Sequence, residues 1–237
     1  MRPIKVQISK NSEYAERGEY HLALDKKWKY YPIYVEKMRR VRDYLTICKN
    51  FKILDIGCGE GVLVNEYRAK GYDISGIDLN FESSFVRRAS ILETGLPSES
   101  IDLALCLDVI EHLNIENQEK ALIEIKRILR PGGIFYATIP NLSHFSSRLK
   151  FLLFGQLIRT SSIDRHKGDR PFSEFKTLIS RYFEIEKTYG IFPTYPLIAI
   201  CTYLFPWAVV GWHRLYNKYL AINSFCFLNF FEARKLL

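Results

Sequence analysis

Cysteine is sparse in this sequence, and its spacing indicates neither a disulfide framework nor a zinc site. The 237 residues contain five cysteines, an odd number without close pairs, whereas disulfide frameworks and zinc sites use paired cysteines at short spacing. The sequence also has no internal repeat and no low-complexity segment. Its first twenty residues contain no continuous apolar stretch, so we expect no signal peptide and a cytoplasmic protein. We predict no metal site.

The composition is that of one large globular domain. Apolar residues make up 48% of the chain and charged residues 25%, which excludes disordered, collagen-like and coiled-coil proteins. The net charge of +8 is unevenly spread, with +6 in residues 1–50, −5 in residues 51–140 and +7 in residues 141–237. This pattern indicates two differently charged ligands, or a basic face turned to something anionic, or simply solvated surface charge.

Strands and helices alternate over the first 140 residues. An amphipathic helix is expected at 31–48, and Gly132 and Gly133 are expected to end a later helix after Pro131. The rhythm predicts a Rossmann-like α/β fold with a mostly parallel, doubly wound sheet. The predicted strands are 51–56, 72–78, 101–107 and 134–139, and the predicted helices between them are 62–69, 81–88 and 117–129.

After residue 140 this rhythm breaks. We predict an apolar stretch at 145–158, a charge-dense loop at 159–170, a helix at 171–180 and late strands at 183–189 and 225–233. We therefore interpret residues 1–237 as a single domain. Its parts are an N-terminal helical extension (1–50), a cofactor-binding core (51–140) and an acceptor-side half (141–237).

The connection 191–222 is long and apolar. No Lys, Arg, Asp or Glu occurs from residue 188 to residue 213, a length that would allow a membrane crossing. Three prolines interrupt the segment, however, and the strand after it must return to the sheet. The composition therefore favours a hairpin or an interfacial helix on an anionic membrane surface. The alternatives are a roof over an apolar acceptor pocket and a dimer interface.

Residues 54–61, Leu-Asp-Ile-Gly-Cys-Gly-Glu-Gly, form a glycine loop that indicates a ligand-binding site. A strand that ends in glycines and opens a helix lets a ligand approach the backbone. Asp78, after the next strand, is placed to accept hydrogen bonds from a ribose diol. Val62 stands where a dinucleotide site has its third glycine. An acidic cluster would repel a pyrophosphate and suit a cationic ligand. Its members are Asp55, Glu60, Asp78 and Asp108.

Four motifs, D-I-G-C-G-E-G, G-I-D-L, L-D-V-I-E-H-L and L-R-P-G-G, occur in order between residues 55 and 133. With them the chain resembles the class I S-adenosylmethionine-dependent methyltransferases, and is most similar to the small-molecule branch of quinone-biosynthesis and surface-glycan-cluster methylases. The resemblance covers residues 41–140. It implies a seven-stranded sheet whose last strand, at 225–233, is antiparallel beside 183–189. It also implies S-adenosylmethionine as cofactor.

The resemblance assigns cofactor contacts residue by residue. The family often has an acidic residue for the adenine amino group. Our alignment places Ser90 there, which can accept one hydrogen bond, and Glu93 is the alternative. Asp78 and Leu79 are assigned to the ribose, and Leu107 and Asp108 flank the cofactor. The residues assigned to the methionine portion are Asp55, Gly57, Cys58, Gly59 and Gly61.

Two histidines are candidate bases. His112 and Glu111 follow the predicted strand 101–107, at its carboxyl end, where open sheets bind ligands, and His112 could take a proton from an acceptor hydroxyl. Alternatively, both residues orient the cofactor or cap the next helix. His144, after the predicted strand 134–139, is the second candidate. The basic loop 159–170 either clamps an acceptor phosphate or carboxylate or is solvated.

The predicted function is methyl transfer from S-adenosylmethionine to oxygen, less favourably carbon, of a small apolar or lipid-linked acceptor such as a quinone precursor or a lipid-carried glycan. We expect a cytoplasmic protein with peripheral contact to the inner face of the membrane through 191–222. The alternatives are an NAD-dependent oxidoreductase, a nucleic-acid methyltransferase and a membrane-bound scaffold. Nucleic acid is disfavoured because 107–110 lacks the Asn/Asp-Pro-Pro-aromatic signature of base amino-group methylation.

Overall fold

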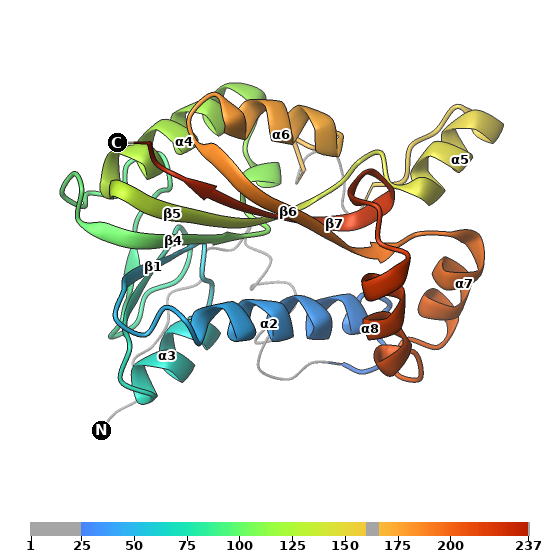
Figure 1. Ribbon diagram of the computed structural model, residues 1–237, viewed down its shortest axis with the longest axis horizontal. Helices are drawn as coiled ribbons and strands as arrows, with labels where there is room; N and C mark the ends of the chain where they lie inside the picture. Colours follow the sequence, from blue (N-terminus) through green and yellow to red (C-terminus); the bar gives the residue numbers. More distant parts are fainter. Residues whose placement is uncertain (1–24, 160–165, 237) are drawn as a thin grey trace.

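A seven-stranded sheet forms the centre of the molecule. The computed structural model describes residues 25–159 and 166–236 and has the strand order β3-β2-β1-β4-β5-β7-β6 (Figure 1). Neighbours from β3 to β5 pair in parallel, whereas β7 is antiparallel to both β5 and β6. This confirms the sheet that the resemblance implied. The strands are β1 (Lys52–Ile56), β2 (Asp73–Asp78), β3 (Val86–Arg88), β4 (Ile101–Leu107), β5 (Leu129–Pro140), β6 (Glu184–Pro193) and β7 (Cys226–Arg234).

Helices cover both faces of the sheet. In Figure 1, α4 and α6 lie above the sheet, and α2 and α3 lie below it. The helix α2 places Ile33, Met38, Val41 and Leu45 against the sheet, as its amphipathic pattern predicts. The α-helices are α2 (Tyr31–Leu45), α3 (Val62–Ala69), α4 (Ile115–Ile128), α5 (Phe145–Phe154), α6 (Phe172–Ser180), α7 (Pro196–Leu204) and α8 (Val210–Tyr219); short 3₁₀ helices are η1 (Ile110–His112) and η2 (Asn223–Phe225).

The core has two layers because the central strands are apolar on both faces. In β4, Ala104 and Cys106 pack in the layer under α4, and Leu103 and Leu105 pack in the layer against α2. Continuous apolar strands of this kind are typical of a parallel sheet that is covered on both sides. The central strands are therefore buried, and their carboxyl ends carry the loops that form the site.

Two local predictions are wrong. Residues 81–88 were expected to be helical, but Val86–Arg88 forms β3, which pairs with β2 from Gly76↔Val86 to Asp78↔Arg88. The edge of β2 supplies the backbone partners for β3, which local periodicity does not reveal. The glycines 132 and 133 do not cap α4, because α4 ends at Ile128 and β5 already begins at Leu129. Gly132 instead lies in an irregularity of β5, with a φ of +73°.

The long connection folds as two short helices. The strand β6 runs on to Pro193, and α7 and α8 occupy most of the rest. Thr202 Oγ1 of α7 lies 3.0 Å from His213 Nε2 of α8, and α8 packs against α2 (Figure 1). Within residues 25–159 and 166–236, no helix has the length and apolar character needed to cross a bilayer.

Candidate cofactor and acceptor site

The glycine loop turns sharply from β1 into α3. Gly57, Gly59 and Gly61 all have positive φ angles, of +70°, +53° and +74°, a conformation that favours glycine. The amide of Gly57 donates to the carbonyl of Ile77, the penultimate residue of β2, at 2.8 Å. A Cβ on Gly57 would lie 2.5 Å from Cγ2 of Val109, which follows β4. The loop is therefore held between the carboxyl ends of β2 and β4.

Asp78 ends β2 with its carboxylate turned toward the glycine loop. Its Oδ2 accepts a hydrogen bond from the amide of Gly59 at 2.9 Å. Its Oδ1 accepts from the amides of Asn80 and Phe81 at 2.8 and 3.1 Å. These backbone donors orient a buried carboxylate, and Oδ2 keeps a second lone pair for a ligand hydroxyl.

Asp55 is buried in β1 beside this carboxylate. Burial raises the pKa of Asp55 to about 7; the ammonium of Lys37 opposes the shift and the charge of Asp78 adds to it. A carboxyl group with such a pKa is poised to ionise when a cation binds beside it. At neutral pH, a cation bound beside Asp55 would therefore shift this carboxyl group to its ionised form.

Lys37 is a site residue that sequence reasoning missed. It reaches from α2, and its Nζ lies 2.6 Å from Oδ2 of Asp108. Burial opposes its charge, but Asp108 outweighs this and raises the pKa of Lys37. The hydroxyl of Thr138 donates to Oδ1 of Asp108 at 2.5 Å. The feature of the sequence that could have indicated Lys37 is its position on the apolar side of α2, four residues after Ile33.

The donor set fits a cationic nucleoside cofactor. The buried ammonium of Lys37 shows that the carboxylates here stabilise a positive group within the protein, as a sulfonium with an amino-acid tail would require. The glycine loop and Asp55 would hold the methionine portion, and Asp78 would hold the ribose. Leu79 and Leu107 are the chain neighbours of Asp78 and Asp108, and their contact with a cofactor stays a prediction. Cys58 lies within the loop, where its amide donates to the carbonyl of Ile77 at 3.2 Å.

Ser90, assigned to the adenine, follows β3. Its hydroxyl accepts a hydrogen bond from the amide of Leu92 at 3.1 Å, and Ser90 forms an isolated bridge with Glu93. The amide of Ala89 donates to the carbonyl of Asp78 at 3.0 Å. Both adenine candidates therefore lie in a turn tied to the end of β2, and both stay predictions.

His112 and His144 have different surroundings. His112 is exposed at the end of η1, five residues after β4 ends, with its ring centroid 4.6 Å from that of His166. His144 is buried, and its Nδ1 lies 2.8 Å from Oγ1 of Thr194 and caps α5 by accepting from the amide of Ser147. Burial lowers the pKa of His144 to about 4. The geometry therefore favours His112 as the group that meets an acceptor, and gives His144 a structural role.

The charge-dense loop is partly engaged in its own contacts. Arg159 forms an ion pair with Asp169 at 3.1 Å, and Nε of Arg170 donates to Gln118 Oε1 at 2.8 Å. Residues 160–165 of the predicted loop lie outside the described residues. The two described arginines are thus held by protein groups, and whether the loop contacts an acceptor stays a prediction.

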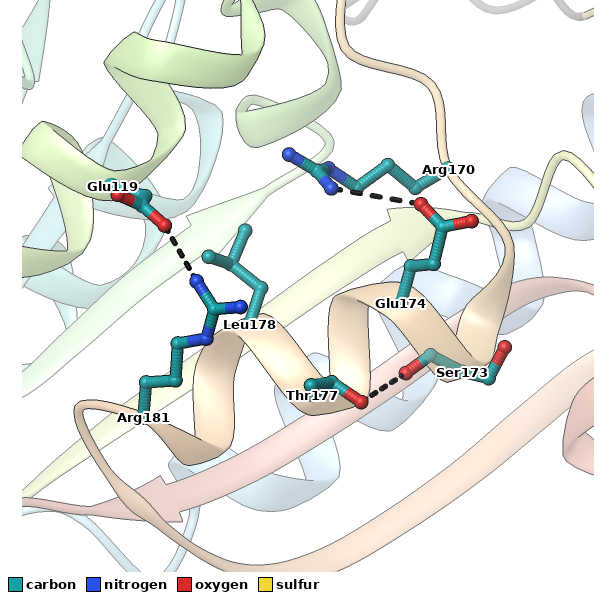
Figure 2. Close-up of a pocket in the computed structure, with 7 residues that line it drawn as sticks. All are labelled: Glu119, Arg170, Ser173, Glu174, Thr177, Leu178 and Arg181. Carbon is teal, nitrogen blue, oxygen red and sulfur yellow. Dashed lines mark hydrogen bonds and ion pairs between the residues drawn. The ribbon is translucent and has the colours of Figure 1, made fainter.

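A shallow pocket of about 240 Å³ lies between α4 and α6 (Figure 2). Its charged side chains are mutually paired: Arg181 contacts Glu119 at 2.8 Å, and Arg170 contacts Glu174 at 3.6 Å. None of its lining residues is among the predicted cofactor residues. We assign it no role in the site.

Known proteins resemble this chain in sequence and fold. A family model described as a methyltransferase domain matches residues 54–137. A ubiquinone biosynthesis O-methyltransferase from Photobacterium profundum is 30% identical over 151 residues, covering 55% of this chain and 62% of the relative. The chain spans about two fifths to three fifths of the length of the first such relatives.

Two solved structures share the fold. One is a SAM-dependent methyltransferase from Archaeoglobus fulgidus, with a TM-score of 0.58 and 17% identity, covering 91% of this chain and all of that one. The other is a Burkholderia thailandensis 1,6-didemethyltoxoflavin-N1-methyltransferase with bound S-adenosylhomocysteine, with a TM-score of 0.55 and 14% identity, covering 94% and 86% of the two chains. Residues 54–137 therefore match a methyltransferase domain, and the chain as a whole has the fold of S-adenosylmethionine-dependent methyltransferases.

Proposed function

We propose that this protein methylates an oxygen atom of an apolar or lipid-linked acceptor. The observation that carries the proposal is a large exposed apolar surface at the end of the molecule toward which β5 runs. The helices α5, α7 and α8 form this end (Figure 1). In open α/β sheets ligands bind outside the carboxyl ends of the strands. The apolar surface is thus on the side where an acceptor would enter.

We call this surface the apolar end. Its side chains are unusually accessible for their type, with Leu152 80% and Leu197 78% exposed. Ring contacts of Phe145 with Tyr195 and with Phe225 join α5 to the α7–α8 region. Its exposed members are Leu149, Phe151, Leu152, Leu153, Phe154, Leu157, Leu197, Ile200, Leu204, Phe205, Trp207, Trp212, Leu215, Tyr219, Leu220 and Ile222.

The charges around the apolar end have one sign. Neither residues 140–163 nor residues 188–231 contain an Asp or Glu, whereas Arg148, Arg214 and Lys218 occur there. Apolar side chains flanked by basic ones are typical of surfaces that lie on an anionic bilayer. This composition supports peripheral membrane contact and an acceptor presented in or near lipid.

Methyl transfer requires mainly that the protein position the acceptor and the methyl group. When bound, S-adenosylmethionine supplies a methyl group on a good leaving group, and alignment at roughly 3–3.5 Å contributes much of the rate. His112, exposed at the end of η1, is the group we expect to assist loss of the acceptor's hydroxyl proton. The similarity to relatives described as O-methyltransferases supports oxygen as the methylated atom.

Radiolabelled S-adenosylmethionine and a fractionated lipid extract test the proposal. We expect label in the apolar fraction, and co-sedimentation of the protein with phosphatidylglycerol vesicles. The double variant Leu152→Ser/Leu197→Ser should neither label the apolar fraction nor co-sediment with the vesicles, since it removes two highly exposed members of the apolar end. The matched control Ile123→Ser changes a half-exposed apolar residue on α4 and should lose neither. Label confined to water-soluble acceptors, with equal turnover in all variants, would refute the proposal.

A further inference from the structure

The carboxylates that suit a cationic cofactor are unfavourable for an acceptor oxygen. Asp55, Asp78 and Asp108 lie near the carboxyl ends of β1, β2 and β4, which parallel strands bring to one edge of the sheet. A hydroxyl is activated as a nucleophile when its pKa is lowered, whereas negative charge nearby raises that pKa. An acceptor that reacts through oxygen therefore needs a positive group beside it.

Lys37 supplies positive charge among these carboxylates. Its Nζ lies 2.6 Å from Oδ2 of Asp108. Burial raises the pKa of Asp55 and of Glu111, and the charge of Lys37 opposes both shifts. The ammonium thus acts on a residue assigned to the cofactor and on the chain neighbour of His112. It lies between the cofactor side of the site and the acceptor side.

The ion pair of Lys37 and Asp108 is held by α2 and β5. The backbone amide of Asp108 donates to the carbonyl of Thr138 at 2.9 Å, and the hydroxyl of Thr138 donates to Oδ1 of Asp108 at 2.5 Å. Asp108 has a φ of +58°, and strain of this kind persists where surrounding contacts enforce it, often at functional sites. The Lys37 side chain is 10% exposed and that of Asp108 31%. The ammonium is therefore fixed, and the pair opens to solvent on the side of Asp108.

The ammonium of Lys37 has more donors than its protein partners use. A lysine ammonium carries three N–H donors. Within residues 25–159 and 166–236, its one hydrogen bond goes to Asp108, and Nζ also lies 5.0 Å from the ring centroid of Tyr34. A buried donor without an acceptor is costly. The oxygen of a bound acceptor would satisfy such a donor.

The strength of one adjacent charge selects the class of hydroxyl. An opposite charge within hydrogen-bond distance lowers a pKa by about 1–3. This brings a phenol, with an ordinary pKa of about 10, close to neutrality. An aliphatic hydroxyl, with a pKa close to that of water at about 16, stays protonated. Lys37 can therefore activate an acidic hydroxyl but not an alcohol.

We propose that Lys37 donates a hydrogen bond to the acceptor oxygen, and that the acceptor is a phenol or an enol that reacts as its anion. This inference rests on the proposed function, because it concerns the acceptor of the same methyl transfer. The hydroxyl proton passes to His112, and Lys37 stabilises the oxygen anion. The methyl–sulfur bond then breaks with both electrons remaining on sulfur, while the oxygen–methyl bond forms. The ether product has no charge for Lys37 to hold.

The ionisation of a bound phenol can be measured without methyl transfer. The probe is 2-octyl-4-nitrophenol, whose anion absorbs visible light, bound to full-length protein that is saturated with S-adenosylhomocysteine. We expect the ionisation constant of the bound probe to be at least about tenfold larger in the wild type than in Lys37→Met. Lys37→Arg, which keeps the charge, should retain most of the difference.

Arg40→Met is the matched control. It removes another cation of α2, whose Nε donates to Oε1 of Glu36 at 2.9 Å, and the bound probe should ionise as in the wild type. Cooperative unfolding in urea shows that each variant is folded.

The outcomes separate this inference from the proposed function. Equal ionisation constants in wild type and Lys37→Met, with the probe bound to both, would overturn the role of Lys37. The proposed function would then remain, since vesicle binding and labelling of the lipid extract test it independently. A probe that does not bind the wild type would overturn the phenol class. A tenfold difference would support the role of Lys37 even where no lipid fraction takes up label.

Discussion

The raised pKa of Asp55 predicts that cofactor binding strengthens as the pH rises through neutrality. Burial raises this pKa to about 7, against an ordinary value of 3.8. A cationic cofactor favours the ionised carboxylate, so protonated Asp55 must release its proton before or during binding. Affinity should therefore be low below the pKa and level off above it.

The size of the effect follows from the titration. With a pKa of about 7, roughly one molecule in eleven has Asp55 ionised at pH 6, and roughly ten in eleven at pH 8. If only the ionised form binds, the dissociation constant falls about tenfold between these pH values, which corresponds to about 1.4 kcal/mol. Stability of the cofactor-free protein has the opposite trend: the native state holds this proton between pH 4 and 7 and the unfolded state does not, so stability falls as the pH rises through that window.

Isothermal titration calorimetry in buffers of different ionisation enthalpy measures both the affinity and the released proton. Asp55→Asn is the matched control because it keeps the shape of the side chain and removes its titration. The affinity of Asp55→Asn for the cofactor should vary much less between pH 6 and pH 8, because the titrating carboxyl group is gone. The histidines and the cofactor's own groups titrate in both proteins, so the difference between them reports Asp55 alone. Equal pH dependence in wild type and Asp55→Asn would refute the reasoning.

Three further substitutions test contacts around the site. Gly57→Ala places a Cβ 2.5 Å from the Val109 side chain at a φ of +70°, so urea denaturation should show about 1–3 kcal/mol less stability; Val109→Ala in the same chain should restore part of this. Asp78→Ala should weaken binding of S-adenosylmethionine by about 1–3 kcal/mol in calorimetry through lost hydrogen bonds, and unchanged affinity would contradict the ribose assignment. His144→Ala should cost about 1–2 kcal/mol of stability. It should leave the pH profile of methyl transfer unchanged between pH 6 and pH 9, because its pKa of about 4 lies below that range; a shifted profile would show that His144 titrates during turnover.

The sheet and the glycine loop could be predicted because their signals are local. The run from Leu54 to Gly61 ends a strand, turns on glycines and opens a helix within eight residues. The carboxylate of Asp78 follows the next strand at the spacing expected for a ribose ligand. Parallel strands bring their carboxyl ends to one edge, so the convergence of these residues follows from the order of elements alone.

Other parts of the site depend on contacts between distant segments. Lys37 contacts Asp108 across 71 positions of the chain, and a single lysine in an amphipathic helix carries no spacing that reveals its partner. His166 lies near His112 because hydrogen bonds from Gln118 and from the amide of Gly168 join two segments that are distant in the sequence. The strand β3 was missed for a similar reason, since its three residues are stabilised by β2 and not by their own periodicity.

The placement of β7 inside the sheet has a consequence for synthesis on the ribosome. The strand β6 is at the edge of the sheet and pairs with β7, so residues 184–193 cannot join the sheet until residues 226–234 have left the exit tunnel. Until then, the nascent chain would expose β6 together with the apolar segments of α7 and α8. A chaperone or the bilayer itself could shelter these segments during translation, and ribosome profiling of chaperone-bound nascent chains would detect the first of these.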